Sequence, residues 1–552
     1  MKILGAALGN CVHVAGVQAF LDLARALGND TIFLGPAVPV KLLVKSIKEH
    51  DPDAVALSYR LTPESVRAVF DELKSELSKD EHLSRRKLYF GGTPPVVALA
   101  REMGIFDACF DGTESDAAAM ALLKGTSLVT GARVPSSDLI SRIEASLPMP
   151  LIRHHFGLPS MEETVKGARM IAESGLVDIV SIAPDQNAQE AFFRPGEMNS
   201  RLDGAGGVPL RSPEHLRSIH QATRVGSHPL LRCYSGTNDL IRWAEMLKET
   251  IDIAWGAVPL TWYSELDGRS KRSLRDAIAE NQAAIKWYAD HGIPVEVNES
   301  HQWAMRRSGD VIELATAYLA AHNAKSLGAK NYVCQFMFDT PRGISSDMDL
   351  AKMLAKAELV ESIRDEGFNV IRMVRSGLQS FSASPNTAKG QLASSVYIAM
   401  ALRPHIVHVV GFSEADHAAR PEEVIESCEI ARGAIGKALL GIASSGFDPK
   451  VVARKTELMK ETRFLLEAMK RLNGASSATP LTSPELIAKA VTEGLLDASD
   501  FKGGKVARGK IVTALVDGAC VAVNPATGKP ITEKERIHDL AVSEHDLDLA
   551  EI

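Results

Sequence analysis

Residues 2–16 read KILGAALGNCVHVAG. The apolar run over residues 2–9 is typical of a buried strand, and residues 14–28 (VAGVQAFLDLARALG) carry apolar side chains at helical spacing. A strand followed at once by a helix is the first unit of a parallel sheet covered by helices. His13 lies on the connection, at the expected carboxyl end of this first strand, where α/β sheets bind their ligands.

The same pattern continues to about residue 125. Further strand candidates are DTIFLG (30–35), AVALSY (54–59), KLYFGG (87–92) and FDACFDG (106–112). Helical stretches with short connections separate them, which indicates a doubly wound parallel sheet. We therefore expect an α/β protein whose residues 1–125 form a flavodoxin-like, Rossmann-type domain.

A second, larger alternation of strands and helices runs from residue 150 to residue 470. Its strand candidates are PLIRHH, VDIVSIA, PLLRCYS, IDIAWGAV, PVEVNES, NYVCQFM, FNVIRMV and IVHVVGF. Eight strand–helix units predict a (β/α)8 TIM barrel with catalytic groups on the carboxyl ends of its strands. Residues 126–149 are interpreted as a linker with one short helix, and residues 480–552 as a small C-terminal α+β appendage.

Composition narrows the class of protein. The chain has 552 residues, of which 45% are hydrophobic and 24% charged, with a net charge of -7. This balance gives no reason to expect nucleic acid or an anionic membrane as a partner. We find no apolar run of about 20 residues and no signal-peptide pattern at the start. Six scattered cysteines without a CxxC pair indicate a reducing compartment, so a cytoplasmic protein is expected.

Four strand-end segments share one family resemblance. They are Cys11-Val12-His13-Val14-Ala15-Gly16, Val55–Thr62, Tyr89–Thr93 and Phe110–Thr113. The first three resemble, in this order, the Asp-x-His-x-x-Gly, Ser-x-Leu and Gly-Gly motifs of the cobalamin-binding domain in adenosylcobalamin mutases and methionine synthase, and the fourth resembles the last loop of that domain. The resemblance implies bound cobalamin, with His13 as the ligand of its cobalt. The other implied cofactor-binding residues are Gly16, Ser58, Arg60, Gly91, Gly92, Gly112 and Thr113.

Cys11 departs from the motif, which has Asp at this place. That Asp accepts a hydrogen bond from the ligand imidazole and tunes its basicity, and a thiol is a weaker partner. Three alternatives stay open. His13 binds cobalt through a less basic ring, another group such as Asn10 compensates, or the cofactor binds without histidine.

The barrel region resembles the large subunit of glutamate mutase. The similar segments are Gly206–Pro209, Pro229–Thr237, Val409–His417 and Ala488–Asp497. The resemblance implies an adenosylcobalamin-dependent carbon-skeleton mutase in which two subunits of the family are fused into one chain. It also implies a homodimer and a small-molecule substrate.

The substrate-binding positions of the family have changed. The three arginines that grip the substrate carboxylates in glutamate mutase fall near His155, Gln189 and Tyr234. A family tyrosine falls near Trp262, and the lysine that meets the adenosyl group falls near Gly411. We therefore expect a more neutral, aromatic pocket that takes a substrate other than glutamate.

Two further residues are candidates for catalysis. Glu299 follows the strand PVEVN and is expected at the barrel mouth. Arg342 follows another strand end and is a candidate for an anionic substrate group. The predicted catalytic residues are thus His155, Gln189, Tyr234, Trp262, Glu299 and Arg342.

Three functions are compatible with these residues. The leading hypothesis is radical isomerisation with adenosylcobalamin. The alternatives are a corrinoid-dependent methyltransferase and a non-catalytic cobalamin-binding sensor or carrier. The identity of the substrate and of the upper cobalt ligand stays open, because fold resemblance alone does not settle function.

Overall fold

Two compact units, Met1–Val134 and Pro135–Ile552, divide the chain and are described separately. The structure is a computed structural model. It describes residues 1–80, 83, 85–112, 114, 116–123, 135–234, 236–442, 445–472 and 480–544. Within these residues, no helix combines the length and the apolar character that a membrane span requires.

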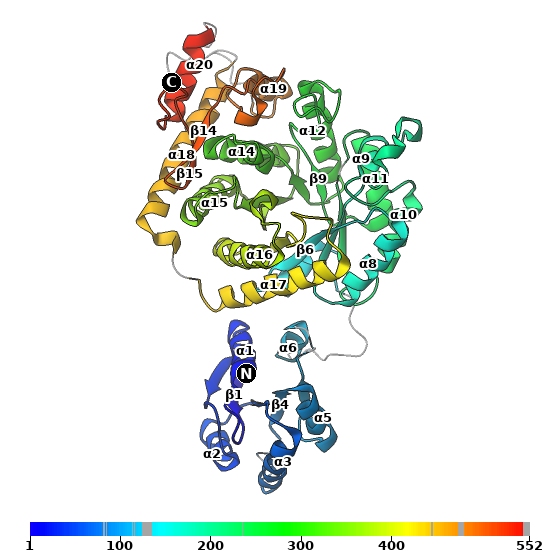
Figure 1. Ribbon diagram of the computed structural model, residues 1–552, viewed down its shortest axis with the longest axis vertical. Helices are drawn as coiled ribbons and strands as arrows, with labels where there is room; N and C mark the ends of the chain where they lie inside the picture. The colour runs from blue at the N-terminus through cyan, green and yellow to red at the C-terminus, as the bar shows by residue number, and fades with distance from the viewer. Residues whose placement is uncertain are drawn as a thin grey trace. The chain divides into compact units, whose positions relative to one another are not determined.

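The first unit is built on a five-stranded parallel sheet (Figure 1). Its strands are β1 (Lys2–Ala7), β2 (Asp30–Phe33), β3 (Ala54–Tyr59), β4 (Lys87–Gly92) and β5 (Ala108–Phe110). Their order, β2-β1-β3-β4-β5, is that of flavodoxin-like folds. The chain reverses direction across the sheet between β1 and β3, so the ligand crevice is expected at their carboxyl ends.

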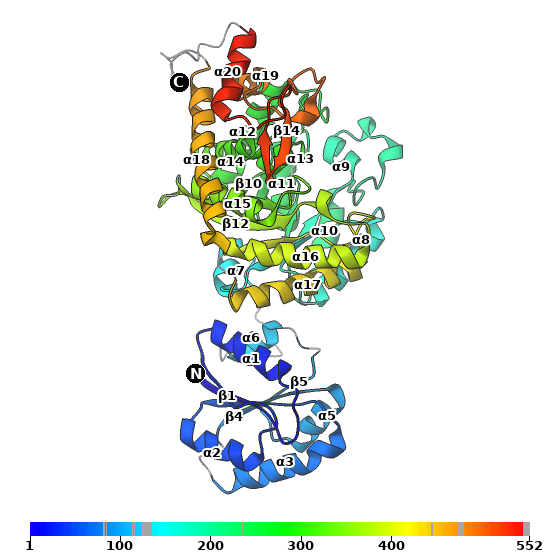
Figure 2. The same ribbon diagram turned by 60° about the vertical axis from the view of Figure 1, so that its left-hand side comes forward.

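Helices cover both faces of this sheet (Figures 1 and 2). One face carries α1 (Ala15–Ala26) and α6 (Asp116–Leu123), and the other carries α2 (Val40–His50), α3 (Pro63–Ser78) and α5 (Pro94–Met103). On the first face, Val17 and Leu21 of α1 belong to a core with Ile3 and Ala56 of the sheet. The five strands predicted from the sequence are all present.

The second unit is a nearly closed parallel barrel. Its strands are β6 (Leu151–Phe156), β7 (Ile179–Ile182), β8 (Leu230–Cys233), β9 (Gly256–Val258), β10 (Val295–Val297), β11 (Asn331–Phe338), β12 (Asn369–Ser376) and β13 (Ile406–Val409). Their order in the sheet is β8-β7-β6-β13-β12-β11-β10-β9, so β8 and β9 lie on either side of the open seam. Next to the open seam, the Ala254 amide donates to the Leu231 carbonyl at 2.8 Å. The predicted flavodoxin-like domain and TIM barrel are thereby confirmed.

Helices surround the barrel strands (Figure 1). The outer helices are α8 (Met161–Glu173), α10 (Pro213–Ala222), α11 (Leu240–Ile251), α12 (Leu274–Asp290), α14 (Asp310–Ser326), α15 (Ser346–Glu361), α16 (Pro385–Ala399) and α17 (Pro421–Leu439). Connections contain α9 (Gln186–Ala191), α13 (Ser300–Met305) and the short 3-10 helices η1 (Pro195–Glu197), η2 (Ser200–Leu202), η3 (Leu378–Ser380), η4 (Met400–Leu402) and η5 (Ser445–Phe447).

One helix closes the amino-terminal end of the barrel. In α7 (Leu139–Ser146), Leu139 and Ile143 share a core with Leu151 and Leu230, which begin two of the strands. Arg142 of this helix is buried and donates to the His228 carbonyl at 3.0 Å. The short helix expected in the linker thus packs as part of the second unit.

The C-terminal appendage is also part of the second unit. It comprises α18 (Pro449–Lys470), α19 (Pro484–Thr492), η6 (Ser499–Phe501), the antiparallel pair β14 (Thr513–Val516) and β15 (Ala519–Ala522), and α20 (Glu533–Glu544). Helix α18 packs against α14 and α15, and β15 also contacts α14. The predicted mixed α+β character is confirmed.

A buried charge network lies between α14 and α15. The Lys352 ammonium is 3.0 Å from Glu313 Oε2 and 3.4 Å from Asp349 Oδ1. Burial raises the pKa of Asp349 to about 7, although Lys352 opposes the shift. The folded protein therefore holds a proton on Asp349 at pH values where an unfolded chain has released it.

We expect Asp349→Asn to remove part of the pH dependence of stability. A carboxyl group with a raised folded pKa stabilises the fold below its unfolded pKa, and this contribution is lost as pH rises to about 7. The free energy of unfolding of the variant relative to wild type should rise by up to about 4 kcal/mol between pH 4 and pH 8. Urea unfolding across this range measures the difference. Asp347→Asn, on an exposed position of the same helix, is the control, and parallel profiles for the two variants would refute the expectation.

Candidate functional site

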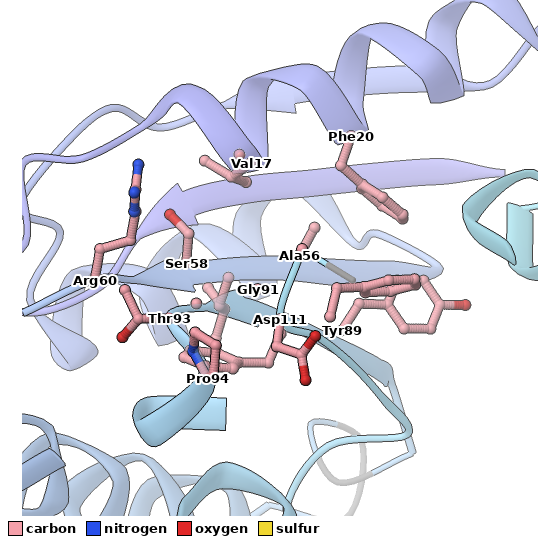
Figure 3. A pocket seen from close by; sticks show the side chains of 16 residues that line it. Val17, Phe20, Ala56, Ser58, Arg60, Tyr89, Gly91, Thr93, Pro94 and Asp111 are labelled. Carbon is pink, nitrogen blue, oxygen red and sulfur yellow. The ribbon is translucent and has the colours of Figure 1, made fainter. Parts of the chain in front are cut away.

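A cavity of about 330 Å³ lies between α1 and the carboxyl-terminal part of the first sheet. Figure 3 shows Val17 and Phe20 of α1 on one side and Ala56, Ser58 and Gly91 of the sheet on the other. Six of the predicted cofactor-binding residues line it: Gly16, Ser58, Arg60, Gly91, Gly92 and Gly112. The strand ends that are distant in sequence therefore converge on one slot.

The inner part of the slot is aromatic. The Phe20 ring packs edge-on against Tyr89 at 5.9 Å and lies 6.0 Å from the Phe110 ring, measured between ring centres. The Tyr89 hydroxyl is buried and has no hydrogen-bond partner among the described residues. Burial also raises the pKa of Tyr89, so the hydroxyl remains a donor. The slot thus offers apolar walls and one unused polar group to a ligand.

The two glycines of β4 have different surroundings. A Cβ atom on Gly91 would meet only the Phe110 carbonyl oxygen, at 3.9 Å, so this position opens the slot. A Cβ on Gly92 would lie 2.6 Å from the Tyr59 carbonyl oxygen, so this glycine allows the backbones to approach. A flat group can therefore lie directly on the backbone at Gly91.

The loop between β1 and α1 presents His13 at the surface. Its Nδ1 lies 3.7 Å from the sulfur of Cys11, which is fully buried. The same sulfur accepts the Arg60 backbone amide at 3.3 Å, and the Ser58 hydroxyl donates to the His13 carbonyl at 3.3 Å. The ring is thus held on its Nδ1 side, and Nε2 has no partner among the described residues.

Asn10 does not compensate for the missing Asp. Its side-chain oxygen accepts the Tyr59 hydroxyl at 2.8 Å, away from His13. The remaining predicted residues lie at the edges of the slot. Arg60 is exposed at its mouth, and Gly112 has a positive φ of 92° in the loop after β5. Thr113 lies outside the described residues.

The donor set and the slot fit cobalamin. An exposed imidazole with a free Nε2 suits a cobalt ligand, and the apolar slot with an open backbone at Gly91 suits a long aromatic tail. His13 would hold the cobalt, while Ser58 and Gly91 would border the tail.

His13→Ala is expected to remove a nitrogen ligand from the cobalt. When cobalamin bound to wild type is photolysed to the cobalt(II) form, the EPR spectrum should show splitting that changes with 15N-histidine labelling. In the variant, labelling of histidine should no longer change the EPR spectrum. The variant should also bind the cofactor about 10- to 100-fold more weakly, because the cobalt loses the imidazole ligand and the contacts that orient it. His50→Ala, at an exposed histidine ending α2, is the matched control. Equal spectra from His13→Ala and wild type would refute ligation by His13.

A second cavity, of about 250 Å³, lies at the carboxyl-terminal end of the barrel strands. Its walls include His155, Tyr234, Arg375 and His408, from strands β6, β8, β12 and β13 or the residues after them. Arg375 Nε donates to the Ser376 carbonyl at 3.2 Å, and no carboxylate pairs with its guanidinium in the described part of the chain. The cavity therefore contains a guanidinium that forms no ion pair among the described residues, and the carboxylate of Glu414 lines another part of its wall.

Two more arginines lie in the barrel interior near this cavity. Arg232 and Arg153 are buried, and Arg232 donates to Glu296 Oε2 at 3.0 Å. Arg153 is 4.0 Å from the same oxygen, and the Trp255 indole donates to it at 2.7 Å. Although burial opposes ionisation, the two guanidinium groups lower the pKa of Glu296. One carboxylate thus faces two arginines, and the interior keeps an excess of positive charge.

The histidines of the cavity are neutral. His155 and His408 stack with ring centres 4.6 Å apart. Burial and the neighbouring arginines lower the pKa of both well below the ordinary value of histidine. The positive charge near the cavity therefore comes from arginine, which favours an anionic ligand such as a carboxylate or phosphate.

The predicted catalytic residues are not all gathered at this cavity. His155 and Tyr234 line it, with ring centres 5.3 Å apart. Gln189 lies in α9, where its amide donates to the Pro184 carbonyl at 2.8 Å. Arg342 is exposed on the loop after β11. The cavity thus brings together two of the six predicted residues.

Glu299 and Trp262 hold a loop. Both are buried, and Glu299 Oε2 accepts the backbone amides of Leu260 and Thr261 at 3.1 and 3.0 Å. Glu299 Oε1 accepts the Trp303 indole at 2.8 Å, and burial raises the pKa of Glu299. These contacts fix the segment after β9. A direct catalytic role for Glu299 or Trp262 stays a prediction.

A side chain at Gly411 would be crowded by its neighbours. An added Cβ would lie 3.1 Å from His154 Nε2 and 3.2 Å from Glu414 Oε1. A larger residue at this strand end would therefore require these two polar side chains to shift by a few tenths of an ångström.

Sequence reasoning missed Arg153, Arg232, Arg375, Glu296 and His408. Each lies within a barrel strand, and the strands that hold Arg232, Glu296 and His408 are otherwise apolar. A cation inside a buried strand is itself a signal, because burying an unpaired charge is costly. The expectation of a largely neutral pocket is therefore corrected.

Comparison with known proteins identifies the first unit. Residues 1–121 match the family model of the B12 binding domain. This part of the chain is a B12-binding domain. The match covers the slot and the His13 loop, so it supports cobalamin as the ligand of this unit. No curated protein matches the chain.

Solved structures with some likeness include cobalamin-binding proteins. A cobalamin-binding protein from Desulfitobacterium hafniense DCB-2 is 29% identical over 20% of this chain and 51% of its own, with a TM-score of 0.18. The chain thus spans about half the length of that protein. A 2,3-dimethylmalate lyase is 12% identical over 60% of this chain and 98% of its own, with a TM-score of 0.28. The cobalamin-dependent S-adenosylmethionine radical enzyme OxsB is 10% identical over 79% and 56%, with a TM-score of 0.18.

Proposed function

We propose that the chain is a cobalamin-dependent isomerase that rearranges a small anionic substrate in the barrel cavity. The observation that carries the proposal is Arg375, a guanidinium that lines the cavity without a carboxylate partner in the described residues. The same chain carries a B12-binding domain. It would therefore hold a cofactor for radical chemistry in one unit and bind an anionic substrate in the barrel cavity.

The cavity residues would bind and orient the substrate. Arg375 would hold a carboxylate or phosphate group through charge-assisted hydrogen bonds. His155 and Tyr234 would contact the rest of the molecule, and the buried Arg153 and Arg232 would add positive potential from below. Adenosylcobalamin, when bound, supplies a carbon-centred radical by breaking its cobalt–carbon bond.

The barrel would also exclude water from the reacting groups. The barrel interior is filled by fully buried side chains, Arg153, Arg232 and Trp255 among them. A closely packed interior would protect a reactive intermediate from side reactions. The B12-binding domain would hold the cofactor through His13 and the slot at Gly91.

Incubation with adenosylcobalamin and a panel of small carboxylates and phosphates, in the dark and without oxygen, tests the proposal. We expect 5′-deoxyadenosine or an organic radical detectable by EPR with at least one anion, and an isomeric product by mass spectrometry. Transfer of the methyl group from methylcobalamin instead would favour a corrinoid methyltransferase. Tight cofactor binding without any turnover across the panel would favour a sensor or carrier.

A further inference from the structure

The contact between Arg153 and His155 fixes the position of a proton. An Arg153 terminal nitrogen, Nη2, lies 2.8 Å from His155 Nε2. A guanidinium group has only donors, so His155 Nε2 must be the acceptor and carries no proton. The ring is neutral, because burial and the neighbouring arginines lower the pKa of His155 well below its ordinary value. Its single proton is therefore on Nδ1.

The groups that shift the pKa of His155 all lower it. Arg153 and His154 come from its own strand, Arg232 from β8, and Arg375 from β12. The ring of Tyr234, directly after β8, and the ring of His408 in β13 contact it, and Glu414, a carboxylate, lines the same cavity. Every arginine in this set opposes protonation of the ring, so the tautomer persists across the neutral pH range.

Arg153 is itself held on three sides. Its Nε donates to the Ser181 hydroxyl at 2.7 Å, and Nη1 lies 3.0 Å from the Met373 sulfur and 4.0 Å from Glu296 Oε2. Burial and Arg232 lower the pKa of Arg153 to about 9, which leaves it charged at neutral pH. Glu296 supports this charge from β10. Arg153 thus cannot turn away from His155 without losing its other contacts.

We propose that Arg153 is a positioning residue that locks His155 as the Nδ1–H tautomer, so that the cavity presents His155 to the substrate as a hydrogen-bond donor. His155 lines the cavity, and Nδ1 has no partner among the described residues. Together with Arg375, this gives two donors from neighbouring parts of the wall. The cavity therefore selects a group rich in acceptors, a carboxylate or phosphate, over a neutral or donor-bearing group. This selectivity rests on the proposed function, whereas the tautomer does not.

NMR of 15N-histidine-labelled, deuterated protein tests the lock without cofactor or turnover. Multiple-bond 1H–15N spectra distinguish the two neutral tautomers from the charged ring, and His155→Asn assigns the signal. Wild type should show Nδ1–H at His155, unchanged from pH 5.5 to pH 8.5. Arg153→Met should lose this tautomer, with Nε2–H or a titrating ring in its place.

Arg142→Met is the matched control, because Arg142 is also buried but binds the His228 carbonyl at the other end of the barrel. It should leave the His155 signal unchanged. An Nε2–H signal or a titration of His155 in wild type would overturn the inference, even if Arg153→Met does not fold. Calorimetry with inorganic phosphate adds the selectivity: Arg153→Met should bind it about 10-fold more weakly than Arg142→Met. If His155 is the Nδ1–H tautomer but the two variants bind phosphate equally well, the proposed selectivity is wrong and the tautomer assignment stands.

Discussion

We expect that replacing Gly91 with leucine will abolish tight binding of cobalamin while the first unit stays folded. The Cβ position of Gly91 is open, with only the Phe110 carbonyl oxygen within 4 Å, so a larger side chain enters the slot rather than the core. No positive φ is required at this strand position. The added side chain would occupy volume that the cofactor tail needs, and we expect affinity to fall by about 100-fold or more.

Absorbance titration with hydroxocobalamin measures the effect, and thermal unfolding checks the fold. Gly91→Ala is the matched variant, because its single methyl group stays at ordinary contact distance and should change affinity by less than about fivefold. Equal affinities for Gly91→Leu and wild type would show that the cofactor does not use the slot.

Arg375→Met is expected to lower the affinity of the barrel cavity for anions by about 100-fold. The guanidinium lines the cavity and is not paired with a carboxylate in the described residues, so its charge is available to a ligand. Removing one partner of a desolvated, hydrogen-bonded charge pair costs about 2–5 kcal/mol. Methionine keeps the length and the apolar stem of the side chain while removing the charge.

Isothermal titration with inorganic phosphate compares Arg375→Met with Arg342→Met. These two variants decide between the arginine found in the cavity and the arginine chosen from the sequence. If Arg342→Met has the larger effect, the anion binds on the exposed loop after β11, and the cavity loses its assigned role.

The strands were predictable because their signal is local. Runs such as residues 54–59 and 331–337 are mostly apolar and rich in residues that favour strands, and the parallel strands of the described residues coincide with the runs predicted from the sequence. The position of the slot was also predictable. Ligands of parallel α/β sheets bind at the carboxyl ends of the strands, and the motifs at these ends contain glycines or polar residues.

The charge of the barrel cavity was not predictable in the same way. The family positions were placed at His155 and Tyr234, each two residues after an arginine of the same strand, Arg153 or Arg232. Residues two apart share one face of a strand, so both members of each pair face the barrel interior. Arg375 lies in β12, which is not a neighbour of either of these strands in the sheet. Only the three-dimensional arrangement shows that it lies near Arg153 and Arg232.

The packing of α7 has a consequence for anyone who divides the chain into fragments. A barrel expressed from residue 150 onward would begin at its first strand but would lack the helix that covers the strand beginnings. Leu151 and Leu230 would lose their contacts with Leu139 and Ile143, and the His228 carbonyl would lose Arg142. Such a fragment would expose an apolar surface prone to association. A fragment that starts at Pro135 keeps this cover and is the sensible boundary for expression.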